Sequence, residues 1–124
     1  MSEISDLADE QYCYLTTTGR VSGKPHEIEI WFALNRATLY MLSGGGAKSD
    51  WVRNIRRNPA VSVRIGNRTF DGAGHVLDPT DSADPLARRL LFDKYSAGYS
   101  GSLVNWRESA LPVAVHLDTG QDRD

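Results

Sequence analysis

The stretch Ser43–Pro59, SGGGAKSDWVRNIRRNP, organises the sequence, because a glycine turn runs directly into a basic helix. Three consecutive glycines leave backbone N–H groups accessible, and the first turn of the helix presents the positive end of its dipole. The helix adds three arginines before Asn58-Pro59 ends it. These features predict the anion-holding end of a small-molecule site. A solvated basic helix face is the alternative that the charges leave open.

The charges of the chain are distributed unevenly around that stretch. Residues 20–68 carry nine bases and three acids. Residues 1–19 carry four acids and no lysine or arginine, and residues 69–124 carry nine acids and five bases. The net charge of the whole chain is −2. A basic middle between acidic ends favours a local anion site, and predicts no nucleic-acid partner.

Length and composition are those of one soluble domain over residues 1–124. The chain is 40% hydrophobic and 24% charged, and Cys13 is its only cysteine. An internal disulfide and a structural zinc site with several cysteines are therefore excluded. No apolar run approaches the roughly 20 residues that span a bilayer. The acidic N-terminal segment 1–11 is neither a secretory signal nor a transit peptide. We therefore expect a cytoplasmic protein with no transmembrane segment.

Three strands are predicted before the glycine turn. Residues 12–18 are aromatic and β-branched, residues 26–34 alternate between apolar and polar, and residues 38–42 lead back to the glycines. We expect these strands to form a three-stranded antiparallel meander. A short acidic helix over residues 3–11, with Ser5 as a possible N-cap, is expected to precede it.

The second half of the chain predicts three more strands, over residues 60–65, 68–77 and 111–117. Gly66-Asn67 is a hairpin signal between the first two, and the longest helix is expected over residues 83–95. The total is about six antiparallel strands and two substantial helices, a pattern typical of a small, mainly β barrel. The tail over residues 119–124 is expected to fray.

Common catalytic and cofactor motifs fail in this sequence. Ala47 and Leu42 occupy the two glycine positions of a phosphate-binding P-loop that would end at Lys48-Ser49. The three histidines are isolated, so no metal site is predicted. Glu27 and Glu29 share a strand face, as an unusual site pair or as a solvated surface. A basic anion site beside many aromatics, without acid–base machinery, suits a redox cofactor that performs the chemistry itself.

Three runs carry a resemblance to a known family: LTTTGRVSGKP (15–25), SGGGAKSDWVRNIRRNPAVSVRIG (43–66) and LPVAV (111–115). They resemble the deazaflavin (F420)-dependent nitroreductase family. The resemblance implies a split β-barrel, also seen in pyridoxamine-phosphate-oxidase-like proteins, and coenzyme F420 with its phosphate and oligoglutamate tail. It further implies an F420-dependent oxidoreductase that passes a hydride to a small organic acceptor, such as a quinone, a nitroaromatic compound or an activated alkene.

Matching positions then imply roles for individual residues. The cofactor tail and phosphate would contact the turn and a nearby basic loop, namely Arg20, Ser22, Gly23, Lys24, His26 and Lys48. The ring system would lie against Trp31, Leu42, Ser43, Gly44, Trp51 and Asn54. The acceptor side would be covered by Tyr95, Tyr99 and Trp106, and the two tyrosines are the candidates for proton donation.

Departures from the family pattern leave alternatives open. Val21 and Gly44 stand where relatives have lysine, and Glu27 and Glu29 replace a more neutral strand. An FMN-binding split-barrel oxidoreductase is one alternative, and a non-catalytic F420-binding protein is another. The expected assembly is a monomer or a homodimer.

Overall fold

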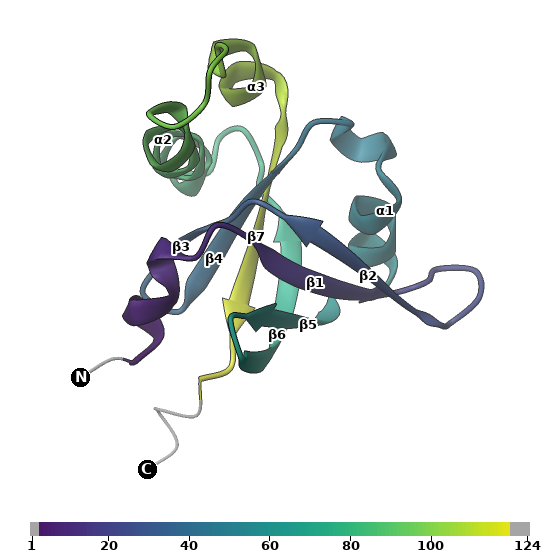
Figure 1. The fold of residues 1–124 in the computed structure, drawn as a ribbon. Coiled ribbons are helices and arrows are strands. Elements are labelled where there is room, and N and C mark those ends of the chain that lie inside the picture. The colour runs from purple at the N-terminus through teal and green to yellow at the C-terminus, as the bar shows by residue number, and fades with distance from the viewer. Residues whose placement is uncertain (1–2, 120–124) are drawn as a thin grey trace.

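The computed structural model describes residues 3–119 of the chain (Figure 1). Seven strands, three α-helices and two short 3-10 helices alternate along them. In chain order they are η1 (Glu3–Asp9), β1 (Cys13–Thr18), β2 (Pro25–Ile30), β3 (Ala33–Asn35), β4 (Thr38–Ser43), η2 (Gly46–Lys48), α1 (Asp50–Arg57), β5 (Ala60–Ile65), β6 (Arg68–Val76), α2 (Ala83–Ser96), α3 (Val104–Ser109) and β7 (Leu111–Leu117). Within these residues no helix is long and apolar enough to cross a membrane.

All seven strands form one antiparallel sheet in the order β2-β1-β5-β6-β7-β4-β3. The sheet is strongly curled, with α1 on one side and α2 and α3 together at the other end (Figure 1). The β5–β6 and β7 predictions agree closely with the observed bounds. The expected count of six strands is wrong by one, because residues 26–34 form two short strands in place of one.

The predicted three-stranded meander is also wrong. Strand β2 pairs with β1 at one edge of the sheet, whereas β3 pairs with β4 at the opposite edge. The chain leaves the ladder at Phe32, whose backbone N–H and C=O are bound by side chains of α2. Since a buried backbone group needs only one good partner, these side chains replace a neighbouring strand and let the chain cross over.

Two hydrophobic clusters lie on the two faces of the sheet. The first contains Val52 and Ile55 of α1 together with Leu15, Val63 and Met41 of the strands. The second contains Leu91 and Tyr95 of α2 with Tyr40 and Leu42 of β4. Because Met41 and Leu42 are consecutive, they point to opposite faces of β4, and each face is covered by its own helical layer.

Two glycines of β6, Gly72 and Gly74, allow backbones and side chains to approach closely. A Cβ on Gly72 would lie 2.8 Å from Val115 Cγ1 and 2.9 Å from the carbonyl oxygen of His116. A Cβ on Gly74 would lie 3.3 Å from the side chain of Ile55, so this glycine lets α1 settle against the sheet.

Three smaller expectations have clear outcomes. The N-terminal helix is a 3-10 helix that begins at Glu3, so Ser5 lies within it and is not its N-cap. Cys13 is buried in the first cluster, and burial raises the pKa of its thiol to about 12. This thiol is therefore a packing group. Most of the tail expected to fray, residues 120–124, lies outside the described residues.

Candidate functional site

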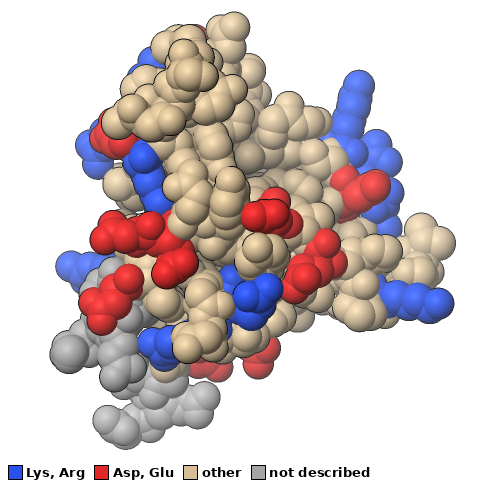
Figure 2. Space-filling model, viewed as in Figure 1, with Lys and Arg blue, Asp and Glu red and all other residues tan. Residues whose placement is uncertain are grey.

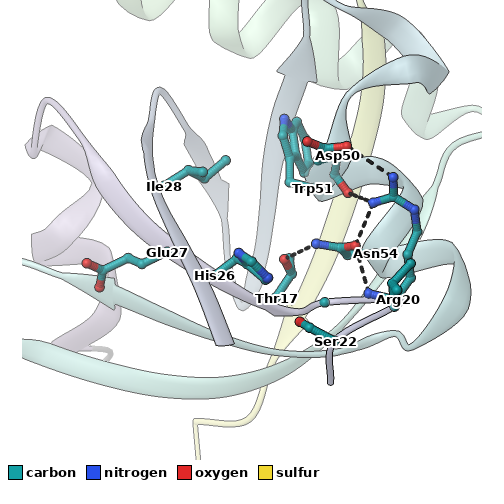
Figure 3. Close-up of a pocket in the computed structure, with 11 residues that line it drawn as sticks. Thr17, Arg20, Ser22, His26, Glu27, Ile28, Asp50, Trp51 and Asn54 are labelled. Atoms are coloured by element: carbon teal, nitrogen blue, oxygen red, sulfur yellow. Dashed lines mark hydrogen bonds and ion pairs between the residues drawn. The ribbon is translucent and has the colours of Figure 1, made fainter. Parts of the chain in front are cut away.

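The larger of two cavities beside β2 lies between the β1–β2 turn and the start of α1. We call it the turn cavity. Its volume is about 470 Å³. Figure 3 shows Ile28 and Trp51 across the cavity from each other, with His26, Thr17 and Asn54 beneath them. Its lining residues are Thr17, Gly19, Arg20, Val21, Ser22, His26, Glu27, Ile28, Asp50, Trp51 and Asn54.

Asn54 joins α1 to the β1–β2 turn beneath the turn cavity. Its side chain is buried, with 3% exposed. The amide oxygen accepts the backbone N–H of Arg20 at 3.1 Å and the Arg20 Nη1 at 2.9 Å. The amide nitrogen donates to Thr17 Oγ1 at 3.0 Å. Both ends of the amide are thus used within the protein, so Asn54 shapes the cavity through its neighbours.

Arg20 is held in place by α1. Besides Asn54, its guanidinium donates to the backbone oxygen of Asp50 at 3.4 Å and to Asp50 Oδ1 at 3.1 Å. The ion pair is open to water, with 30% of the Arg20 side chain and 84% of the Asp50 side chain exposed. Such a pair contributes little to stability. Its effect is to orient the guanidinium while part of its donor capacity remains free for a ligand.

Gly19 allows two polar side chains to converge at the turn cavity. A Cβ at this position would lie 2.6 Å from Ser22 Oγ and 2.7 Å from His26 Nε2. Ser22 Oγ also accepts the N–H of Lys24 at 3.1 Å, which leaves its hydroxyl proton for a ligand. Only glycine leaves room for this cradle, which we call the Gly19 cradle.

The glycine turn that opens the predicted anion site is stabilised from within. Ser43 Oγ donates to the carbonyl oxygen of Gly46 at 2.9 Å and lies 2.8 Å from Ser49 Oγ. Ser49 occupies the N-cap position of α1, but its hydroxyl bonds to Ser43 and makes no capping bond. Gly46 has a φ of +64°, a conformation that favours glycine.

The second cavity adjoins the first along β2, and we call it the aromatic cavity. Its volume is about 330 Å³, and it is lined by Tyr12, Glu29, Ile30, Trp31, Leu42 and Trp106. Ile28 of the turn cavity and Ile30 of the aromatic cavity are two residues apart on the same face of β2. They are therefore roughly 7 Å apart along the strand, and the two cavities share β2 as a wall.

Aromatic side chains surround Trp31 on three sides. Tyr95 stacks on it with ring centroids 4.1 Å apart and an interplanar angle of 3°. Trp106 and Tyr99 meet it edge-on, at 5.5 Å and 6.1 Å between centroids. Stacked and edge-on aromatic pairs each contribute about 0.5–1.5 kcal/mol beyond area burial. The arrangement fixes the Trp31 indole as one wall of the cavity.

The hydroxyl of Tyr95 is committed to the backbone of Phe32. It accepts the N–H of Phe32 at 3.0 Å, and it lies 2.9 Å from the carbonyl oxygen of Gln11 and 3.0 Å from that of Phe32. Burial raises the pKa of Tyr95 to about 12. Tyr95 therefore acts here as a structural group that positions the residue next to Trp31, and its hydroxyl does not face the aromatic cavity.

Lys94 binds the same backbone group from the same helix. Its Nζ donates to the Phe32 carbonyl oxygen at 2.9 Å and lies 3.7 Å from the centroid of the Phe32 ring. Burial lowers the pKa of Lys94 to about 8. Together, Lys94 and Tyr95 fasten the crossover between β2 and β3 to α2.

The structure brings together about half of the residues expected at the site. The turn cavity includes Arg20, Ser22, His26, Trp51 and Asn54, and the aromatic cavity includes Trp31, Leu42 and Trp106. Tyr95 and Tyr99 contact Trp31 from outside the cavity lining. The expected site residues that line neither cavity are Gly23, Lys24, Ser43, Gly44 and Lys48.

Sequence reasoning missed several residues that line the cavities. Thr17 and Ile28 follow from strand alternation once β1 and β2 are paired, because Thr17 lies opposite His26. Gly19, Asp50 and Tyr12 belong to no pattern that indicates a ligand site, so the sequence gives no signal for them.

Comparison with solved structures shows the fold. An F420-H2-dependent reductase shares 20% identity with this chain over 87% of it and 94% of that chain, with a TM-score of 0.68. An F420 reductase shares 22% identity over 95% of both chains, with a TM-score of 0.67. A protein from Listeria innocua described as a pyridoxamine 5′-phosphate oxidase shares 20% identity over 93% of this chain and 90% of its own, with a TM-score of 0.68. The expected split-barrel fold is thus confirmed.

The sequence profile of one protein family covers nearly the whole chain. It is described as F420H(2)-dependent quinone reductase and matches residues 3–118. A search of curated proteins gave no match. The family match confirms the resemblance found in the sequence, together with oxidoreduction as the class of reaction and F420 as the cofactor. The chain belongs to the F420H(2)-dependent quinone reductase family.

Proposed function

We propose that this protein transfers a hydride from reduced F420 to a quinone, with the cofactor tail in the turn cavity and the acceptor in the aromatic cavity. One observation carries the proposal. Two cavities lie along β2: the first brings Arg20, Ser22 and His26 together beside Glu27 and Asp50, and the second is lined by Tyr12, Trp31 and Trp106 among others. Donors in one cavity and aromatic rings in the other suit a ligand with an anionic tail and a flat ring, beside a second flat molecule.

Arg20, Ser22 and His26 of the turn cavity can hold an anionic tail, and the acid Asp50 in the same lining is paired with Arg20. The Gly19 cradle offers Ser22 Oγ and the His26 ring, and Arg20 offers its remaining guanidinium donors. Figure 2 shows several basic side chains at the end of the molecule where α1 and the β1–β2 turn lie, with an acidic one beside them; other basic and acidic side chains are spread over the rest of this face. Phosphate and carboxylate groups are stabilised at the basic end.

The protein's part in the reaction is to bind, orient and exclude water. When bound, reduced F420 supplies a hydride and a proton, with which a quinone becomes a hydroquinone. Trp31 offers a flat wall to an aromatic acceptor, and Trp106 closes the cavity from α3. Fixed walls of this kind hold two reactants in contact and lower the entropic part of the barrier.

The first experiment is a fluorescence titration of cofactor-free protein with F420, run beside FMN. We expect saturable F420 binding and F420H2-dependent reduction of menadione. Binding that is lost in the Arg20→Ala, Lys24→Ala double variant would place the tail at the turn. Binding of FMN alone would contradict the proposal and favour the flavin alternative. Tight F420 binding without turnover of any quinone, nitroaromatic or activated alkene would favour a non-catalytic binding protein.

The Gly19 cradle gives a sharper prediction. In Gly19→Ala the new methyl group displaces Ser22 Oγ and the His26 ring, which are ends of side chains that can move. We expect the Kd for F420 to rise about tenfold, equivalent to one or two lost hydrogen bonds, with little change in Tm. Gly98→Ala is the matched control, because nothing lies within 4 Å of its added Cβ. Equal affinity in both variants would remove the cradle from the tail site.

Tyr99 is proposed as a cover over the acceptor, with the proton of the reaction exchanged through water. Its side chain is 46% exposed and meets Trp31 edge-on. Because phenylalanine keeps that contact, we expect Tyr99→Phe to retain kcat within about twofold, whereas Tyr99→Ala raises KM for the quinone. A fall in kcat of about tenfold or more in Tyr99→Phe would instead make its hydroxyl the proton donor.

A further inference from the structure

Glu29 is the one acidic residue among those that line the aromatic cavity. Its side chain is exposed on β2, and Tyr14 from the adjacent strand donates to Glu29 Oε2 at 3.4 Å. Three aromatic residues line the same cavity: Tyr12, Trp31 and Trp106. Ring faces and a carboxylate both attract positive charge, and neither stabilises a negative charge.

The charges around Glu29 do not cancel its effect. Arg64 of β5 lies over the Tyr14 ring at 4.2 Å, and its Nη1 is directed to the carbonyl oxygen of Gly66. Lys94 of α2 is tied to Phe32 and interacts with two further acids, Asp9 and Glu10. Within residues 3–119 no lysine or arginine forms an ion pair with Glu29. Its carboxylate therefore keeps its negative charge uncompensated by an ion pair, at the edge of the cavity that Glu29 lines.

From this arrangement we infer that Glu29 sets the charge class of the acceptor. The aromatic cavity takes flat aromatic molecules that are cationic or neutral, and it discriminates against those carrying a sulfonate or carboxylate. The inference rests on the proposed function for the identity of the cavity as the acceptor site. The charge preference of the cavity can be tested independently of that function, because we expect the cofactor-free protein to show it in binding.

The first test measures binding without cofactor. In a Trp51→Phe background, where Trp31 and Trp106 are the remaining tryptophans, the fluorescence is titrated with N-methylquinolinium and with 2-naphthalenesulfonate, two flat probes of opposite charge. We expect the cation to bind about fivefold or more tightly than the anion at low salt, as for one charge contact near the surface. The preference is expected to shrink as salt is raised, because exposed charges are screened.

Glu29→Gln and Glu27→Gln form the matched pair of variants. The two glutamates lie two residues apart on β2, but Glu27 lines the turn cavity and Glu29 the aromatic cavity. We expect Glu29→Gln to bring the two affinities within about twofold, and Glu29→Lys to reverse the preference. We expect Glu27→Gln to keep most of the preference for the cationic probe. An unchanged preference in Glu29→Gln, an equal loss in Glu27→Gln, or no binding of either probe would overturn the inference.

The second test uses turnover. The kcat/KM values with F420H2 are compared for menadione, 1,4-naphthoquinone-2-sulfonate and a naphthoquinone bearing a trimethylammonium group. For each protein, kcat/KM with the cationic quinone is divided by kcat/KM with the anionic quinone. Dividing this ratio in wild type by the same ratio in Glu29→Gln cancels the intrinsic reactivity of the quinones. We expect the resulting quotient to be about five. A quotient near one would overturn the inference while leaving the quinone reductase function intact. Absence of turnover with all three quinones, beside a retained binding preference, would overturn the proposed function and leave the inference standing.

Discussion

Asn54→Ala is expected to lower the free energy of unfolding by about 3 kcal/mol and to weaken F420 binding in the protein that remains folded. The substitution leaves the backbone N–H of Arg20 and the buried hydroxyl of Thr17 without their partner. It also opens a small cavity beneath α1. Because the same amide tethers Arg20, the turn proposed to hold the tail loses its fixed position.

Denaturant unfolding, followed by far-UV circular dichroism, measures the stability change, and F420 titration at low denaturant measures affinity. Thr17→Val serves as the comparison, since it removes only the bond from Asn54 Nδ2 and keeps the shape of the side chain. We expect this variant to cost about 1 kcal/mol and to leave F420 affinity nearly unchanged. If Asn54→Ala were no more costly than Thr17→Val, the link from α1 to Arg20 would not have the importance assigned to it.

Trp31→Ala is expected to reduce kcat/KM for quinones by at least about tenfold, a loss of roughly 1.4 kcal/mol of transition-state binding. The indole forms one wall of the aromatic cavity and holds three aromatic neighbours in place. Stability should also fall, by about 2 kcal/mol, because the Tyr95 stack and two edge contacts disappear.

Trp31→Phe distinguishes the role of Trp31 as a wall of the aromatic cavity from its contribution to packing. A phenyl ring can still stack on Tyr95, so we expect most of the stability to return and part of the activity with it. F420 affinity, measured by titration, should change less than quinone KM in both variants. An F420 affinity that falls as steeply as quinone turnover would place the deazaflavin ring, and not the acceptor, against Trp31.

Much of the fold follows from local patterns in the sequence. The hairpin at Gly66-Asn67 and the last strand were predictable, because each depends on residues near one another in the chain. The partner of residues 33–35 was not. The backbone of Phe32 is held by Lys94 and Tyr95, which are 62 and 63 positions away, and no alternation pattern reports such a contact.

The candidate site, too, was predictable in part. The polar turn and the set of aromatics were recognised by residue type, and the structure places most of them around two cavities. The hydrogen-bond and ion-pair partners of these side chains within the protein could not be predicted from the sequence. Tyr95 was a candidate proton donor, yet its hydroxyl is occupied by backbone atoms. Arg20 was expected to face a phosphate, and the ion pair with Asp50 was not foreseen.

The two hydrophobic clusters have a consequence for how this protein can change over evolutionary time. Trp51 and Ile28 of the turn cavity pack on the cluster that contains α1, whereas Trp31 and Trp106 pack on the cluster that contains α2. Substitutions in the α2–α3 layer can therefore remodel the aromatic cavity without disturbing the packing that supports the turn cavity. If the proposed function holds, the choice of acceptor can change step by step while F420 affinity is kept.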